Sequence, residues 1–238
     1  MSTQANFFWV ENEEEEKGQW GKAKGEGFRW RYRRIWIHSG DEDSNMTTQR
    51  QPSRHYSVED YLCLEEASET KHEFYQGEIF AMVGASRNHN RIAGNVFAAL
   101  RAALKGTNCE AFTSDMRLRT PSGLYTYPDA MVICGPMVLS DDRLETATNP
   151  CVLVEVLSES TRSYDQNEKM HLYRLIPALR DYLVIEQAIV KVDHWRLESS
   201  GQWALTQHQS KNEVLQLSAI PFRLAVSEIY ERVELSPA

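Results

Sequence analysis

The chain lacks the features that mark membrane, secreted and nucleotide-hydrolysing proteins. No apolar run approaches the roughly 18 residues that a membrane-spanning helix requires. The first residues, MSTQANFFWVENEEEE, have no basic stretch followed by an apolar one, which a secretory signal needs. The phosphate-binding pattern of P-loop enzymes, GxxxxGK followed by Ser or Thr, is also missing. We therefore expect a cytoplasmic protein that makes no membrane contact.

Cysteine and positive charge are both scarce. The four cysteines (Cys63, Cys109, Cys134 and Cys151) have no CxxC spacing, so we expect buried, reduced thiols rather than zinc ligands or disulfides. The formal net charge of −8 argues against a protein that coats nucleic acid through bulk charge. It remains compatible with an enzyme that has a local basic cleft.

The 238 residues suit one domain with an extension, and residues 1–52 differ from the rest. They hold four of the six tryptophans, an acidic run from Glu13 to Glu16, and the basic-aromatic run FRWRYRRIW. We expect a poorly structured or atypical extension here, and a folded domain over residues 53–238. Two alternatives stay open for the extension. The basic-aromatic run could be an arm that stacks on nucleic-acid bases, or Met46 could be the natural start.

Hydrophobic periodicity predicts an alternating set of helices and strands from about residue 55 onwards. The expected elements are a helix from Ser57, a hairpin over 72–83 turning at Gln76-Gly77, a helix over 88–105, strands over 109–120, 127–134 and 151–158, a helix over 163–175, a strand over 178–186, a hairpin over 191–209 turning at Gly201, and a loop with a short helix over 218–233. This order predicts an α+β (α/β-like) fold built around one mixed central sheet flanked by helices, with an N-terminal and a C-terminal hairpin.

Two acidic residues lie inside segments that otherwise read as buried strands. Asp129 stands in YTYPDAMVIC and Glu155 in PCVLVEVLSEST, where strand alternation puts Leu153 and Leu157 on the same face as Glu155. An ionised carboxylate is unfavourable in such surroundings unless a cation or donor compensates it. If the two strands pair, a divalent cation is the simplest shared partner, and oxygen ligands suit Mg²⁺ or Mn²⁺. The alternative is that each acid pairs with an arginine or caps a loop.

The helix after Glu155 supplies a candidate lysine. Asp165, Lys169 and Tyr173 are spaced four residues apart, so they share one helical face. Lys169 is placed to reach back toward Glu155, where a lysine beside a metal can orient an attacking water and stabilise charge at phosphorus. The alternative is a solvated ion pair between Asp165 and Lys169.

Polar residues at the start of the long helix are candidates for contact with DNA. A helix N-terminus favours phosphate, so His89 and Arg91 are placed to bind the DNA backbone. The alternative for His89 is an ordinary polar residue in the first turn of a helix.

Four segments together resemble a known family. The segments KHEFYQGEIFAM, NHNRIAGNV, YPDAMVICGP and CVLVEVLSESTRSYDQNEKMHLYRLIPALRDYLVIE resemble, in this order, the Uma-two family of restriction-endonuclease-like proteins. The resemblance runs from about Tyr56 to the C-terminus. This family is placed in the PD-(D/E)XK nuclease superfamily, whose core is a mixed sheet flanked by helices. The resemblance therefore implies a restriction endonuclease-like core and metal-dependent hydrolysis of DNA.

Carried over residue by residue, the resemblance assigns the catalytic groups. Asp129 matches the PD aspartate, Glu155 matches the second acid, and Glu73 looks like the additional acid that superfamily members supply from near the first helix. The superfamily pattern places a lysine two residues after the second acid, where this chain has Leu157. Resemblance to members whose lysine has moved to the next helix assigns that role to Lys169.

The expected function is a Mg²⁺- or Mn²⁺-dependent DNA endonuclease. Asp129, Glu155, Glu73 and the backbone carbonyl of Val156 are expected to hold the metal, while Lys169 orients the water. A homodimer or higher homo-oligomer is expected, because nucleases that cut both strands usually act as symmetric pairs. One alternative is a catalytically degenerate nuclease-fold protein that binds DNA or a partner. Another is an assembly role in which Trp195 and Trp203 bury a dimer interface, although core packing of these rings is the simpler role.

Overall fold

The computed structural model describes residues 55–82, 84–140, 145–158 and 168–235. The extension expected over residues 1–52 and the expected helical position of Asp165 lie outside these ranges. In chain order the elements are α1 (Val58–Ala67), β1 (His72–Tyr75), β2 (Glu78–Ala81), α2 (Arg87–Ala103), β3 (Cys109–Thr113), β4 (Arg117–Arg119), β5 (Tyr125–Thr126), β6 (Ala130–Cys134), β7 (Thr146–Ala147), β8 (Val152–Leu157), α4 (Glu168–Tyr173), β9 (Asp181–Glu186), β10 (Val192–Leu197), β11 (Trp203–His208), β12 (Val214–Gln216), β13 (Arg223–Ala225) and α5 (Val226–Ile229).

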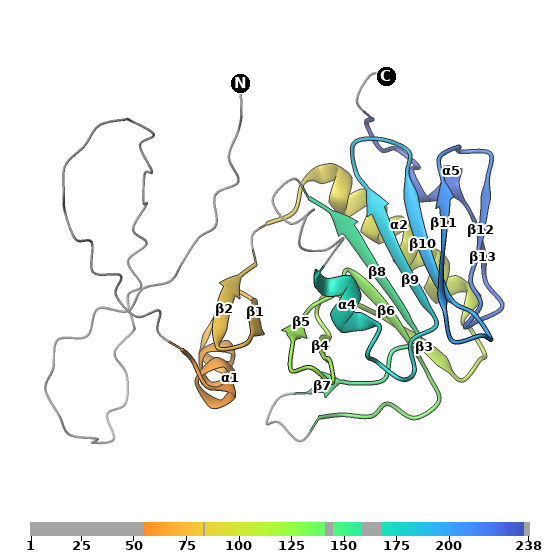
Figure 1. Cartoon of the computed structure of the whole chain (residues 1–238). Coiled ribbons are helices and arrows are strands. Elements are labelled where there is room, and N and C mark those ends of the chain that lie inside the picture. Colours follow the sequence, from red (N-terminus) through yellow and green to blue (C-terminus); the bar gives the residue numbers. More distant parts are fainter. Residues whose placement is uncertain (1–54, 83, 141–144, 159–167, 236–238) are drawn as a thin grey trace, which may run out of the picture.

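Six strands form the central sheet, in the order β11-β10-β9-β8-β6-β3 (Figure 1). Strands β8 and β9 run parallel, whereas the other neighbours in this sheet are antiparallel. The expected α+β fold with a mixed central sheet is therefore confirmed, and β10 and β11 form the expected C-terminal hairpin.

The two faces of the central sheet are covered by different helices. Val152, Val154 and Val156 of β8 pack in the hydrophobic cluster that includes α2 and α5, as the alternation predicted. The next cluster lies on the opposite face, where Leu153 and Leu157 meet Met170 and Tyr173 of α4. Figure 1 shows α2 and α4 on opposite sides of the sheet. Each fully buried Val or Leu side chain stabilises the fold by about 1.5–3 kcal/mol.

A second sheet has the order β2-β1-β5-β4-β7 and carries α1 beside it (Figure 1). Tyr61 of α1 stacks on Phe74 of β1 and contacts Tyr125 of β5, so an aromatic cluster joins the helix to this sheet. The expectation of one sheet is therefore incomplete. The single strand expected over 109–120 is interrupted by a turn at Ser114-Asp115, and its halves β3 and β4 lie in different sheets. Serine and aspartate favour such turns because their side chains form hydrogen bonds with nearby backbone groups, which would otherwise pair with a neighbouring strand.

Local signals in the first part of the domain are confirmed. Ser57 caps α1 in a capping box with Asp60. Strands β1 and β2 form the expected hairpin, and Gln76 and Gly77 at its turn have φ values of 50° and 86°. Such positive values are typical of a two-residue type I′ turn. A Cβ at position 77 would also clash with Nδ1 of His55, so a larger residue would have to displace that ring.

Two expectations from the sequence are wrong. Cys109 and Cys134 are joined by a disulfide, whereas Cys63 and Cys151 are free thiols. The pairing of β3 with β6 places Cys109 directly opposite Cys134, a register that cysteine spacing along the chain does not reveal. The loop expected after residue 218 contains β13, which pairs with β12 in a two-stranded sheet.

The hairpin of β10 and β11 contributes two tryptophans to the core. Trp195 and Trp203 are half-buried against the cluster on the α4 face, and the guanidinium of Arg174 lies 4.6 Å and 5.8 Å from their ring centres. This packing supports the simpler of the two roles considered for these tryptophans. Among the described residues, no helix has both the length and the apolar character of a membrane span.

Candidate active site

The two strand acids lie next to each other along paired strands. In the register of β6 and β8, Ala130 is opposite Val154, so one further step brings Asp129 opposite Glu155. Asp129 immediately precedes β6, and Glu155 lies inside β8. The strand pairing on which the expected site depends is therefore present.

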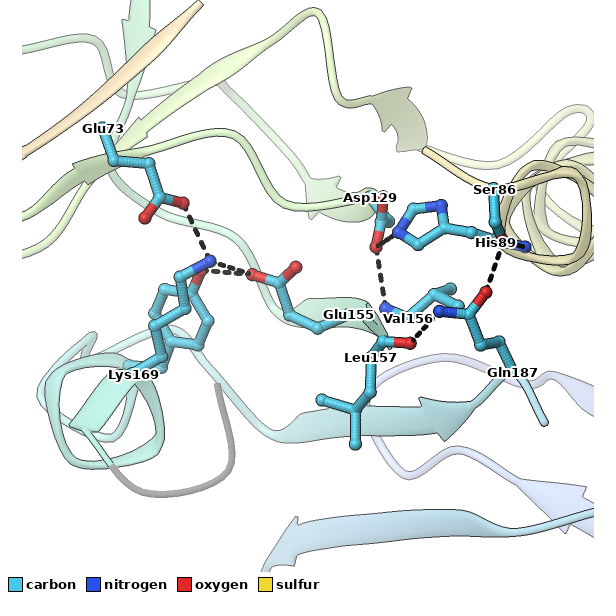
Figure 2. Close-up of polar contacts among 10 residues, drawn as sticks. Glu73, Ser86, His89, Asp129, Glu155, Val156, Leu157, Lys169 and Gln187 are labelled. Carbon is cyan, nitrogen blue, oxygen red and sulfur yellow. Dashed lines mark hydrogen bonds and ion pairs between the residues drawn. The ribbon is translucent and has the colours of Figure 1, made fainter. Parts of the chain in front are cut away.

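Lys169 reaches two carboxylates from α4. Its Nζ lies 2.8 Å from Oε1 of Glu73 and 3.3 Å from Oε1 of Glu155 (Figure 2). All three side chains are nearly buried, with exposed fractions of 6%, 11% and 7% for Lys169, Glu73 and Glu155. Glu73 comes from the second sheet and Glu155 from the central sheet, so the lysine joins the two sheets at this point.

Two hydroxyl groups complete this buried network. Thr126 of β5 donates a hydrogen bond of 2.5 Å to Oε1 of Glu73. Tyr173 of α4 donates one of 2.6 Å to Oε1 of Glu155. Burial, and next the charge of Glu155, hold the pKa of the Tyr173 hydroxyl well above its ordinary value, so this group remains a donor. Such donors are needed because a buried carboxylate loses its hydration.

Asp129 is held by different partners. Its Oδ2 accepts a hydrogen bond of 2.7 Å from the backbone N–H of Val156 and lies 3.2 Å from Nε2 of His89 (Figure 2). The side chains of Asp129 and His89 are 15% and 16% exposed, so this half of the site is closer to solvent than Glu155. His89 reaches Asp129 from the first turn of α2.

A glutamine braces the start of α2 against the end of β8. Ser86 caps α2 by accepting a hydrogen bond from the N–H of His89, and its hydroxyl also bonds the side chain of Gln187. Gln187 donates through Nε2 to the carbonyl of Leu157 at 2.8 Å. The helix that carries His89 is thereby tied to the strand that carries Glu155 (Figure 2).

Of the two candidate DNA contacts, only His89 faces the acids. Residues two apart on a helix lie about 200° apart around its axis, so Arg91 is on the other side of α2 from His89. There, Arg91 pairs with the carboxylate of Glu234 at 3.1 Å.

Leu157 shows why the usual lysine position holds an apolar residue. Its side chain is 1% exposed and packs with Met170 and Tyr173 in the cluster under α4. The ammonium group near Glu155 is supplied instead by Lys169 of the helix that covers this face.

The donor chemistry suits a divalent cation. Glu73 and Glu155 bring two carboxylates together at Lys169, and Asp129 adds another acid nearby. Carboxylate oxygens are among the ligands that Mg²⁺ and Mn²⁺ prefer. In the described part of the chain, however, no three His, Cys, Asp or Glu side chains are grouped around one metal position.

Several residues of this network were not among the predicted site residues. Tyr173 shares a helical face with Lys169, and this spacing was the one available signal for it. Thr126 and Gln187 approach only through the pairing of strands and the closure of α2, so no local pattern marks them.

Known proteins resemble this chain in sequence and fold. The Uma2 family, described as "Putative restriction endonuclease", matches residues 58–227. Two uncharacterized proteins of Synechocystis, sll1609 and slr1290, are 40% identical over 160 residues and 37% identical over 177 residues. These alignments cover 67% and 73% of this chain, and 90% of each relative.

A crystal structure from Anabaena variabilis shares the fold. It is described as a putative nuclease belonging to DUF820, and it superposes with a TM-score of 0.57 at 15% sequence identity. The match covers 68% of this chain and 91% of that chain. Because the family match spans most of the domain that carries Glu73, Glu155 and Lys169, the chain belongs to the Uma2 family, described as putative restriction endonucleases.

Proposed function

We propose that this protein is a metal-dependent endonuclease that hydrolyses phosphodiester bonds of DNA. The observation that carries the proposal is the lysine held between two buried acids, Glu73 and Glu155, beside Asp129 at the end of the paired strand. A buried ion pair of this kind is weak evidence for a role in stability alone. Membership of the Uma2 family supports nuclease chemistry.

The chain's own residues divide the chemistry between them. Asp129, Glu155, Glu73 and the carbonyl of Val156 would hold Mg²⁺ or Mn²⁺. When bound, the cation supplies Lewis acidity toward the phosphate and lowers the pKa of water. Lys169 donates hydrogen bonds that orient the attacking water and stabilise the charge that develops on the phosphate oxygens. His89, at the solvent-facing edge of the site, contacts the DNA backbone.

Cleavage of plasmid DNA with Mg²⁺ or Mn²⁺ tests the proposal. We expect the wild type to cut, and we expect Asp129→Asn and Lys169→Met to lose about 100-fold or more of the rate, since removal of one charge-stabilising group typically has this effect. Asp193→Asn and Lys191→Met are the control variants, because these residues form an ion pair at the start of β10. Asp193 is 15% exposed, as Asp129 is, and both controls should cut like the wild type. Equal cutting by all variants would contradict the proposal.

A second candidate function is a catalytically degenerate nuclease-fold protein that binds DNA or a partner. The partners of the acids favour this function in one respect, because the two acids are bonded to different protein groups. Asp129 bonds His89 and Val156, whereas Glu155 bonds Lys169 and Tyr173. Calorimetry separates the two functions. DNA binding without any Mn²⁺ binding or cleavage would support the second.

We also propose a homodimer, because cutting both strands of a duplex is most simply done by two symmetric sites. Sedimentation at micromolar concentration would test this, and a monomer that still makes double-strand breaks would contradict it.

A further inference from the structure

We propose that Tyr173 is a positioning residue of this site, whose hydroxyl fixes the carboxylate of Glu155 for cation binding independently of Lys169. The inference rests on the proposed function and adds a residue to it. Tyr173 would not touch DNA or the cation, because its role is exerted through Glu155 alone.

The contact between Tyr173 and Glu155 is the shorter of two that converge on one atom. The hydroxyl of Tyr173 lies 2.6 Å from Oε1 of Glu155, whereas Nζ of Lys169 lies 3.3 Å from the same oxygen. Short hydrogen bonds from a hydroxyl to a carboxylate are the charge-assisted, stronger kind. The orientation of Glu155 therefore depends more closely on the tyrosine than on the lysine.

Lys169 divides its charge between two acids. Its shorter contact, at 2.8 Å, is with Glu73, which Thr126 also holds. A turn of Lys169 toward a phosphate would lengthen or break its contact with Glu155. The hydroxyl of Tyr173 carries no charge to be drawn toward the substrate, so it keeps Glu155 in place during this movement.

The tyrosine ring has little freedom to move. Tyr173 is 0% exposed, and its ring meets that of Tyr182 edge to face, with centres 5.3 Å apart. Tyr182 belongs to β9, which pairs with β8, so the strand beside Glu155 also supports the ring that holds it. A rigid partner behind a metal ligand fixes the ligand's direction, and its loss typically weakens metal binding about 10- to 100-fold.

The test compares Tyr173→Phe with Tyr230→Phe in the full chain. Tyr230 is also buried and donates its hydroxyl to the carbonyls of Glu186 and Lys191, but it packs on the opposite face of the sheet. Both variants lose one buried hydroxyl, so both should melt at lower temperature than the wild type. Mn²⁺ binding is measured by calorimetry without DNA, together with the rise in melting temperature that Mn²⁺ causes in each protein.

We expect Tyr173→Phe to bind Mn²⁺ about 10- to 100-fold more weakly and to show little stabilisation by Mn²⁺. Its kcat should fall while its KM for DNA stays near the wild-type value, because the tyrosine does not contact DNA. Tyr230→Phe should match the wild type in both respects.

Other results would overturn the inference. If Tyr173→Phe binds Mn²⁺ and cuts DNA like Tyr230→Phe, Tyr173 is not a positioning residue, while the proposed function stands. If Tyr173→Phe shows no cooperative melting even with Mn²⁺, its role is in folding. If the wild type neither binds Mn²⁺ nor cuts DNA, the proposed function fails and the inference fails with it.

Discussion

Lys169 links the stability of the fold to the chemistry proposed for the site. Its ammonium group neutralises part of the charge of two buried acids, and each of these would be costly to bury alone. The same group is the proposed orienting group of the reaction. Stability of the metal-free fold and chemistry at the phosphate therefore depend on one side chain.

Replacing Lys169 by methionine should separate these two roles. With the ammonium group removed, the buried carboxylates of Glu73 and Glu155 lose the positive charge that they share, and we expect the metal-free protein to be destabilised by about 3–5 kcal/mol. Because a positive charge beside the acids repels a metal cation, its loss should at the same time tighten Mn²⁺ binding. Denaturant unfolding and calorimetry, each with and without Mn²⁺, measure the two effects. An unchanged stability of Lys169→Met would contradict this account.

Residue by residue, the sequence revealed the charged groups better than the neutral ones. Glu155 and Asp129 stood out because a carboxylate is unusual in a buried strand, and Lys169 because helical spacing directed it toward them. Thr126 and Gln187 gave no such signal, since hydroxyl and amide groups are common and their partners lie far away in the chain. The division of the acids between Lys169 and His89 also depends on tertiary structure.

At the scale of elements, β9 is anchored at its first residue. Asp181 is 0% exposed, bonds His194 at 2.8 Å, and accepts hydrogen bonds from the N–H groups of Ser218 and Ala219. Burial alone would raise the pKa of Asp181, but the hydrogen bonds from His194, Ala219 and Ser218 outweigh burial and hold it below its ordinary value. This carboxylate therefore links the central sheet to the segment before β13.

The anchor predicts a dependence of stability on pH. Because the pKa of Asp181 is lower in the folded state, its contribution is fully present above its unfolded pKa of about 3.9 and is lost as pH falls through the folded value. Asp181→Asn should lower the free energy of unfolding by about 3 kcal/mol at pH 7. The asparagine NH₂ group would place hydrogens where the carboxylate oxygens of Asp181 accept hydrogen bonds. Denaturant unfolding from pH 7 to pH 3 measures this, with Asp193→Asn as the control. If the stability difference between Asp181→Asn and the wild type does not shrink below pH 4, the proposed role of the ionised Asp181 is wrong.

The disulfide between β3 and β6 predicts a response to reduction. A bridge between residues 25 apart in the chain should stabilise the fold by about 3 kcal/mol by restricting the unfolded state. We expect dithiothreitol, or Cys109→Ser with Cys134→Ser, to lower the melting temperature, whereas Cys63→Ser, which changes an exposed free thiol, should not. Thiol titration of the unfolded, unreduced protein should find two free groups, Cys63 and Cys151, and a finding of four would refute the bridge.

Elements with strong local signals were predicted well, and pairings between distant segments were not. The capping box at Ser57 and the positive φ values at Gln76-Gly77 are set by residues close in sequence, so α1 and the first hairpin are confirmed. The break between β3 and β4 and the pairing of β12 with β13 depend on partners brought together only by folding. Very short strands such as β5 have too few residues for any periodicity.

At the scale of the whole molecule, the boundary drawn at residue 53 stays a prediction from the sequence, and the structure describes the domain from residue 55 onwards. Its hydrophobic clusters run from Tyr61 to Tyr230, and the family match begins at residue 58. We expect a chain beginning at residue 53 to keep the melting temperature within a few degrees, its Mn²⁺ affinity and its cleavage rate. Calorimetry and plasmid cleavage check this. Loss of cooperative melting would show that the first segment belongs to the folding unit.

The placement of Lys169 on α4 changes how relatives should be recognised. In this chain the acid and the lysine that meet at the site are 14 positions apart, and the position two after the acid is Leu157, a core residue. A motif search for the acid with a lysine two residues later would therefore not find a chain of this kind. We expect catalytically competent relatives to keep the acid and the more distant lysine together, and expect relatives that lack either one to be binding proteins.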